Sequence, residues 1–89
     1  MAWVYILTNR RNGTLYVGVT SNLSNRLNQH FGSRTGFTAR YGLKRLVHAE
    51  VFDEIYDAIV REKQIKRWRR QKKIDLIERD NPDWDELLW

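Results

Sequence analysis

The chain has 89 residues, of which 42% are hydrophobic and 12% aromatic, a composition that predicts one folded domain over residues 1–89 and excludes an intrinsically disordered chain. It contains no cysteine, so disulfides, thiolate zinc sites and a cysteine nucleophile are excluded. No stretch approaches the roughly 18 apolar residues of a membrane span, and the first residues lack the pattern of a secretion signal. We therefore expect a cytoplasmic protein with no membrane partner.

The net charge of +5 is unevenly distributed along the chain. Residues 61–73 carry eight basic side chains and one acidic side chain, whereas residues 80–86 are acidic. A concentrated basic surface favours polyanions through phosphate contacts and the release of counterions. A solvated helix surface is the ordinary alternative for such a run, so the charge alone assigns no function.

The first predicted elements are two strands joined by a hairpin. Residues 3–7 and 14–19 are rich in β-branched and aromatic side chains, which favour strands. Asn12-Gly13 between them is typical of a two-residue hairpin turn. This turn would place Leu7 opposite Gly18 in the antiparallel pair.

Alternation along the hairpin predicts two different sheet faces. One face carries Tyr5 and Tyr16 beside Gly18, which permits a close approach to the backbone. Tyrosines also favour strands and cover packing surfaces, so each tyrosine alone needs no functional explanation. The other face is aliphatic and is predicted to form a core surface from Val4, Ile6, Leu15, Val17 and Val19.

A helix is predicted next, with N-cap candidates at residues 20–22 and an end at Gly32. Arg26 and His30 are four residues apart and lie along one edge of the apolar stripe of this helix. A hydrogen-bonded structural histidine and an arginine that extends along the surface are the ordinary explanations for such positions.

The second half of the chain predicts a glycine-rich loop over residues 32–42, a strand over 43–52 and a helix from about Ile55 to Trp68. A second helical stretch, from about Gln71 to Glu78, either continues this helix or breaks from it. Asn81-Pro82 then opens a short turn, with Asn81 as the N-cap. The order ββαβαα predicts an α+β fold, in which a small three-stranded, mainly antiparallel sheet is flanked by helices.

Glu62 lies on the apolar side of the predicted helix 55–68, together with Ile59 and Ile65. A carboxylate directed at a core is costly unless it is paired or bound to a metal. Two interpretations follow. Glu62 either forms an ion pair with Arg26 or another basic residue, or it is a metal ligand at the floor of a cleft.

The stretch WVYILTNRRNGTLYVGVTSNLSNRLNQH resembles the first half of the GIY-YIG nuclease domain. Trp3-Val4-Tyr5 stands where this family has Gly-Ile-Tyr, and Tyr16-Val17-Gly18 stands where it has Tyr-Ile-Gly. Arg26 and His30 have the spacing of the family's helix motif. The Gly and Ile of the first triplet are absent, but its tyrosine is retained. Val19 stands where some members have a lysine, so no role of that lysine transfers.

The resemblance covers nearly the whole chain. Glu62 in REKQIK resembles the metal-binding glutamate of the family, and Asn81 stands where a late polar residue is expected. N-capping before Pro82 is the structural alternative for Asn81. The chain looks closest to the small, single-domain bacterial members, and it is similar to the N-terminal nuclease domain of an excision-repair endonuclease.

The resemblance implies an endonuclease that hydrolyses DNA phosphodiester bonds in DNA repair, recombination or processing. It implies one Mg²⁺ or Mn²⁺ ion, with Glu62 as the protein ligand. Arg26 would neutralise the charge that grows on the phosphoryl oxygens.

The resemblance also implies roles for the remaining motif residues. Tyr16 would orient or deprotonate the attacking water, with Tyr5 as its partner. His30 would relay that proton or hydrogen-bond the phosphate, and the sequence does not choose between these paths. Gly18 and Asn81 would support the site.

DNA is the expected partner ahead of RNA, a recruiting protein is a further candidate, and the chain would be a monomer or a weak dimer. Two other function classes stay open. One is a non-catalytic nucleic-acid-binding module with the same fold. The other is a protein-interaction domain that uses residues 83–89, which could instead fold back onto the chain's own core. Basic side chains outside the motifs are candidates for phosphate contacts, and these are Arg34, Arg40, Lys44, Lys66, Arg67 and Arg70.

Overall fold

The computed structural model describes residues 1–32 and 42–87, with the backbone alone at residues 30–32. Its three strands form one antiparallel sheet in the order β2-β1-β3. The strands are β1 (Ala2–Thr8), β2 (Leu15–Thr20) and β3 (Arg45–Phe52). Because β1 is the central strand, β2 and β3 are the two edges of the sheet.

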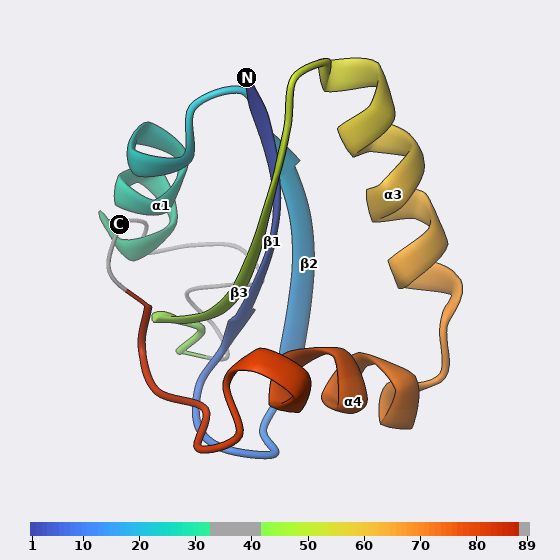
Figure 1. Cartoon of the computed structure of the whole chain (residues 1–89). Coiled ribbons are helices and arrows are strands. Elements are labelled where there is room, and N and C mark those ends of the chain that lie inside the picture. The colour runs from blue at the N-terminus through green and yellow to red at the C-terminus, as the bar shows by residue number, and fades with distance from the viewer. Residues whose placement is uncertain (33–41, 88–89) are drawn as a thin grey trace.

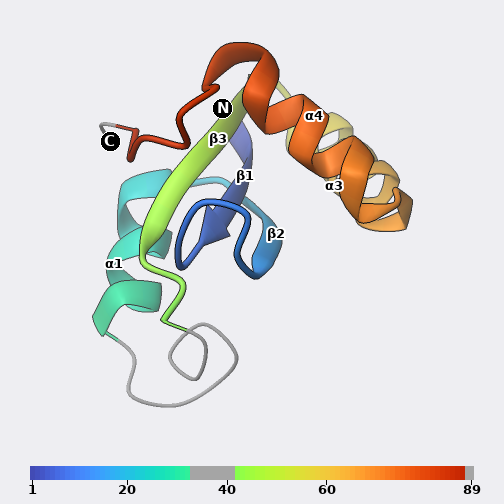
Figure 2. The same ribbon diagram turned by 90° about the horizontal axis from the view of Figure 1, so that it is seen from below.

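The described helices cover both faces of this sheet (Figure 1). They are α1 (Leu23–Gly32), α3 (Ile55–Arg67) and α4 (Arg70–Asp80). Seen from below, α1 lies on one side of the strands, and α3 and α4 lie on the other (Figure 2). The predicted α+β fold is therefore confirmed. No described helix has the length and apolarity needed to cross a membrane.

The sheet separates two hydrophobic clusters, as the alternation along the hairpin predicts. The aliphatic face packs against α3, α4 and the C-terminal segment, and its buried residues include Val4, Ile6, Val17, Ala58, Ile65, Ile77 and Trp84. The face that carries the tyrosines packs against α1, and its buried residues are Tyr5, Leu7, Leu27, Leu43 and Leu46.

The register of the hairpin differs from the prediction. Leu7 lies opposite Tyr16, and Thr8 opposite Leu15, so residues 9–14 form the connection. The predicted pairing of Leu7 with Gly18 is wrong by two residues. A shift of two residues leaves every side chain on its original face, which is why the predicted division into faces is still correct.

Side-chain hydrogen bonds explain the longer connection. Asn12 has a positive φ of 57°, and the Gly13 amide donates to the Arg10 carbonyl at 2.9 Å, so a tight turn is present. The Thr14 amide, however, donates to Asn9 Oδ1 at 3.1 Å. This bond satisfies the Thr14 amide locally, and the regular strand pairing begins only beyond it.

The helix α1 begins as the sequence predicts. Asn22 is its N-cap, because Asn22 Oδ1 accepts a hydrogen bond from the Asn25 amide at 3.1 Å. The Asn22 amide in turn donates to Thr20 Oγ1 at 3.1 Å. These bonds set the angle at which the chain leaves β2 and bring α1 back across the tyrosine-bearing face, where Leu27 is fully buried.

The helical stretch after residue 55 breaks in two. Trp68 and Arg69 have extended backbone, with ψ angles of 151° and 154°. The Trp68 ring is half-buried beside two cations, with Arg61 Cζ at 5.1 Å and Lys72 Nζ at 4.3 Å from its centroid. The break sets α4 at an angle to α3 (Figure 1), so that α4 runs across the end of the sheet and α3 runs along it.

Asn81 ends α4 and does not begin a new helix, so its predicted role as an N-cap is wrong. Its amide donates to the Ile77 carbonyl at 2.9 Å, and residues 82–83 form a turn. The buried side chain donates from Nδ2 to the carbonyls of Val47 and Asp85, at 3.1 Å and 2.8 Å. Its Oδ1 accepts from the Asp85 amide at 3.0 Å. Asn81 thus ties the end of α4 to β3 and to the C-terminal segment.

The described part of the C-terminal segment folds back onto the chain's own core. Trp84 is fully buried, and its Nε1 donates to Glu78 Oε2 at 2.7 Å. The Leu87 amide donates to the Leu46 carbonyl at 2.8 Å. Of the apolar residues in this segment, Leu88 and Trp89 lie outside the described residues.

Candidate active site at the free edge of β2

Tyr5 and Gly18 are cross-strand partners at the centre of the tyrosine-bearing face. The Tyr5 side chain is fully buried and lies directly over Gly18. A methyl group on Gly18 would overlap Cζ and Oη of Tyr5. The ring, rather than an unusual backbone conformation, is therefore what requires glycine at this position.

The structure brings Tyr5, Tyr16 and Arg26 together. The two tyrosine rings have centroids 6.3 Å apart and an interplanar angle of 38°. Arg26 approaches them from α1, and its pKa is raised, first by its hydrogen bond to the Tyr5 hydroxyl and further by Tyr16. Arg26 Nη1 also donates to Gln29 Oε1 at 3.4 Å. An exposed guanidinium thus lies at the hydroxyl ends of two tyrosines.

Burial raises the pKa of the Tyr5 hydroxyl, and the neighbouring Tyr16 adds to this effect. The hydrogen bond with Arg26 favours the phenolate and opposes the shift, but the pKa stays above its ordinary value of 10.0. Tyr5 is consequently protonated at neutral pH. It can donate a hydrogen bond or position a neighbour, but it is not a base.

Four other predicted residues differ in how far the structure describes them. His30 follows Arg26 by one turn of α1, and the structure describes its backbone alone. Arg34 and Arg40 lie outside the described residues. Lys44 is exposed just before β3, where its amide donates to the Gly42 carbonyl at 3.0 Å.

Glu62 lies on α3, across the sheet from Arg26. Its side chain is 12% exposed, which agrees with the inward direction that helical phase predicts. Glu62 Oε2 is 3.0 Å from Lys66 Nζ, one helical turn away. Of the partners considered for this carboxylate, the one observed is a basic residue of its own helix.

A pocket of about 290 Å³ lies beside β2, at the outer edge of the sheet. No described strand pairs with this edge. The residues that line the pocket are Leu15, Tyr16, Val17, Lys66 and Lys73. Tyr16 belongs to the cluster with Arg26, and Lys66 belongs to the pair with Glu62. Tyr16 thus borders both the Arg26 cluster and this pocket, and Lys66 borders the pocket and pairs with Glu62.

The residues at this edge fit a divalent cation that has a single protein ligand. Within residues 1–32 and 42–87, no group of three His, Cys, Asp or Glu side chains could hold a metal by itself. A largely buried carboxylate is a hard oxygen donor, and Mg²⁺ ordinarily keeps several waters and uses one or two carboxylates together with substrate phosphates. Glu62 has this chemistry, and Lys66 is the cation that neutralises it here.

Two of the predicted phosphate contacts differ in their surroundings. Arg70 Nη2 donates to the carbonyls of Asn12 and Gly13, at 2.7 Å and 2.6 Å, and so holds the hairpin connection against α4. Arg67 is exposed at the end of α3. The environment of Arg70 is thus that of a structural residue, whereas Arg67 faces solvent.

Lys73 was not expected from the sequence, although it stands at the end of the basic run. Its place beside Tyr16 and Lys66 depends on the break at Trp68, which changes the direction of the chain before α4. Helical phase carried through residues 55–78 would have put Lys73 on the same side as Lys66, seven residues earlier, but about 10 Å further along the helix axis. The charge run itself was the available signal, and it did not distinguish one lysine from another.

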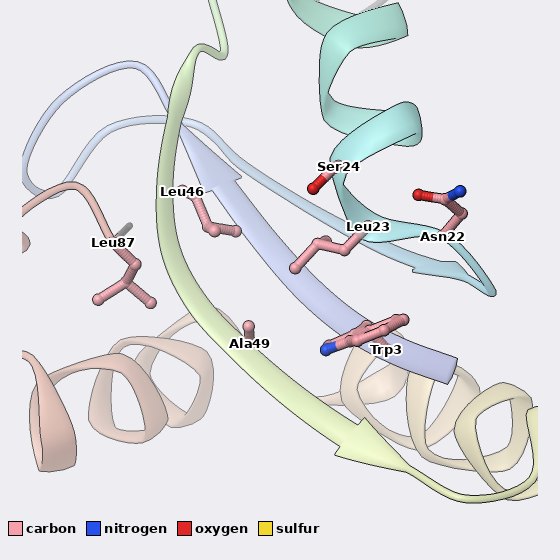
Figure 3. Close-up of a pocket in the computed structure, with 7 residues that line it drawn as sticks. All are labelled: Trp3, Asn22, Leu23, Ser24, Leu46, Ala49 and Leu87. Carbon is pink, nitrogen blue, oxygen red and sulfur yellow. The ribbon is translucent and has the colours of Figure 1, made fainter. Parts of the chain in front are cut away.

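A second pocket, of about 390 Å³, lies on the tyrosine-bearing face between α1, β1 and β3 (Figure 3). Leu23 of α1 and Leu46 of β3 face each other across it, and Leu87 of the C-terminal segment lies behind β3 (Figure 3). None of the described residues that line it is ionisable. The described lining of this pocket therefore offers no side chain for acid–base chemistry.

Comparison with known proteins identifies a matching family. The chain matches the GIY-YIG catalytic domain over residues 1–75. A UPF0213 protein of Syntrophus aciditrophicus (strain SB) is 39% identical over 85 residues, which cover 91% of this chain and 93% of that protein. The UPF0213 protein CPE1444 of Clostridium perfringens is 37% identical over 78 residues, which cover 86% and 83% of the two chains.

A solved structure has the same architecture. The solution NMR structure of the UPF0213 protein BH0048 from Bacillus halodurans superimposes with a TM-score of 0.59 at 26% sequence identity. The match covers 96% of this chain and 92% of that one. The chain therefore belongs to the GIY-YIG family, a nuclease-type family, and its relatives are UPF0213 proteins.

Proposed function

We propose that this protein is a divalent-metal-dependent endonuclease that hydrolyses DNA phosphodiester bonds. One observation carries the proposal: Tyr16, which interacts with Arg26, shares a pocket with the lysine that pairs with Glu62. A phosphate-binding cation, hydroxyl groups and a metal-binding carboxylate are the parts that phosphodiester hydrolysis needs. Family membership supplies the reaction class, and a cytoplasmic role in DNA repair, recombination or processing belongs to the same proposal.

Arg26 binds the scissile phosphate in this mechanism. Its guanidinium is exposed at the mouth of the tyrosine cluster, so a phosphate can reach it without disturbing the core. Its hydrogen bonds with the tyrosines favour the charged form and limit its rotamers. Negative charge that develops on the phosphoryl oxygens is therefore met by a positioned cation, which avoids reorganisation during the reaction.

The two tyrosines position the water that attacks phosphorus. Tyr5, whose pKa is raised, keeps its proton and holds both Arg26 and Tyr16 in place. Tyr16 is less buried and borders the pocket, so its hydroxyl oxygen is the one that accepts a hydrogen bond from the water. His30, one turn after Arg26, takes up the proton that the water loses as the new phosphorus–oxygen bond forms.

Glu62 would hold the cation through its carboxylate oxygens. A bound Mg²⁺ or Mn²⁺ supplies Lewis-acid stabilisation of the leaving 3′ oxygen. Burial of the Glu62 side chain limits its motion, and its partner Lys66 lines the pocket that Tyr16 also lines. The carboxylate would therefore hold the cation with little motion of its own.

The test compares the wild-type protein with Glu62→Gln on supercoiled plasmid and on branched and single-stranded oligonucleotides, in Mg²⁺, Mn²⁺ or EDTA. Glu54→Gln is the matched control. Glu54 is the exposed N-cap residue of α3, and its side chain makes no capping hydrogen bond. We expect metal-dependent cleavage by the wild type and the control, and a loss of about 100-fold or more in Glu62→Gln.

Circular dichroism first shows that all three proteins fold. Equal cleavage by Glu62→Gln and the wild type would contradict the proposal. DNA binding without cleavage of any substrate in either metal would also contradict it and would favour a non-catalytic binding module.

A further inference from the structure

The pocket at the edge of β2 contains two lysines from successive helices. Lys66 comes from α3 and Lys73 from α4, and both border the same space of about 290 Å³ beside Tyr16. No carboxylate is among the described residues that line it. The Lys66 ammonium pairs with Glu62, which does not line the pocket. Two cationic side chains therefore border one small space with no acidic side chain among its described lining, and this suits the pocket to an anion.

The remaining walls of the pocket are apolar. Leu15 and Val17 lie on β2 with their side chains towards the aliphatic face, and both contribute to the lining. The volume of the pocket is roughly ten times the volume that one water molecule takes up in the liquid, about 30 Å³. This is enough for a phosphate and the sugar attached to it. An apolar wall next to two cations is complementary to a sugar that carries a phosphate.

We propose that Lys66 and Lys73 form a second phosphate-binding site, which holds the nucleic acid backbone next to the scissile phosphate. This proposal rests on the proposed function. Tyr16 borders both places, so the strand would run from Arg26 across Tyr16 and along the free edge of β2. Lysine suits this role because its ammonium group accepts many phosphate geometries on a flexible stem.

Lys66 has two partners in this arrangement. In the free protein it lies 3.0 Å from Glu62, and its stem also borders the pocket. A backbone phosphate in the pocket draws Lys66 away from Glu62 and leaves that carboxylate to the divalent cation. Lys66 therefore competes with the metal when nucleic acid is absent, and binding of the two ligands is coupled reciprocally.

The first experiment measures how tightly a fluorescent oligonucleotide binds in EDTA, at several KCl concentrations. Lys73→Met is compared with Lys63→Met, since Lys63 is an exposed lysine of the same basic run that does not line the pocket. We expect Lys73→Met to weaken binding about 5- to 10-fold and to reduce the salt slope by about one, as for the loss of one phosphate contact. Lys73→Arg should restore most of the affinity.

The second experiment measures Mn²⁺ binding by calorimetry without nucleic acid. Lys66→Met removes the competing cation and should bind Mn²⁺ roughly 10-fold more tightly than Lys63→Met, which changes the net charge equally. Thermal unfolding shows that each variant folds.

Equal oligonucleotide affinities for Lys73→Met and Lys63→Met would overturn the phosphate site. Equal Mn²⁺ affinities for Lys66→Met and Lys63→Met, or no Mn²⁺ binding by any variant, would overturn the proposed competition between Lys66 and the metal for Glu62. Neither experiment measures cleavage, so their failure leaves the cleavage test of Glu62 standing. Conversely, lysine effects without cleavage would reject the nuclease and retain the anion site.

Discussion

At the scale of single residues, the close contact between Tyr5 and Gly18 decides where the hydroxyl groups of the proposed site lie. The Tyr5 ring occupies the space that any larger side chain at position 18 would need. Because Tyr5 is fully buried, its ring cannot move into solvent to make room. The pair therefore couples the stability of the sheet to the geometry of the site.

Gly18→Ala is expected to lower the free energy of unfolding by about 1–3 kcal/mol, because the added methyl forces the Tyr5 ring off its rotamer or bends the strand. Cleavage should fall with it, since the hydroxyl next to Arg26 is displaced. Tyr5→Phe is the matched comparison: it keeps the ring on Gly18 and removes only the hydroxyl. Urea unfolding of both variants checks the prediction, and a Gly18→Ala protein as stable as the wild type would rule it out.

The residue scale also shows what the sequence could predict. Helical phase was sufficient to predict that the Glu62 side chain points inward, because a regular helix keeps its phase over two turns. The choice of Lys66 over Arg26 as its partner was not available from phase, since Arg26 lies across the sheet and is engaged by the tyrosines. The pair with Lys66 is a local one, since Lys66 follows Glu62 by four residues on the same helix, and this spacing was the available signal.

At the scale of elements, a partly buried ionic network joins β3 to α3. Arg61 donates to both carboxylate oxygens of Glu50, from Nε at 2.8 Å and from Nη2 at 3.1 Å. His48 Nε2 lies 2.7 Å from Glu50 Oε2. Burial alone raises the pKa of Glu50, but the hydrogen bonds from Arg61 and His48 outweigh it, and the pKa lies below its ordinary value of 4.5.

This network gives the fold a pH dependence of known sign. Because the pKa of Glu50 is lower in the folded state, its contribution to stability is complete above about pH 4.5 and is lost as the pH falls through the lower, folded value. We expect Glu50→Gln to be less stable than the wild type by about 2 kcal/mol at pH 7. The difference should shrink below pH 4.5.

Chemical unfolding of the two proteins between pH 7 and pH 3 measures this difference. Glu54→Gln is the control for an exposed carboxylate, and its curve should run parallel to that of the wild type. A constant difference between the wild type and Glu50→Gln over the whole range would show that the ion pair does not carry the acid sensitivity.

The elements themselves follow from the sequence to different degrees. Alternation along the hairpin was enough to predict which side chains share a face of the sheet. The observed pairing is shifted from the expected one by two residues, and such a shift leaves every side chain on its face. The exact pairing of the two strands could not be predicted, because the Asn9 side chain accepts a hydrogen bond from the Thr14 amide within the connection. The break at Trp68 was left open by helical phase, and the cations around its ring are contributed by two different helices.

At the scale of the whole molecule, the proposed site depends on the order of the strands. With β2 at an edge, the pocket that Tyr16 lines is also lined by Lys66 of α3 and Lys73 of α4, while Arg26 of α1 interacts with Tyr16 from the other face. A central β2 would have put a strand between Arg26 and Glu62. The sequence motifs name the residues of the proposed site, but only the topology shows that they come from opposite faces of one sheet.

The most direct test of this account is the single-turnover rate of metal-dependent DNA cleavage by Tyr16→Phe, Glu62→Gln and the double variant. If the two residues serve one site across the edge of β2, the double variant should be no slower than the slower single variant, because residues that act as a unit have non-additive effects. Wild-type rates in either single variant, or losses that multiply in the double variant, would contradict a single active site at this edge.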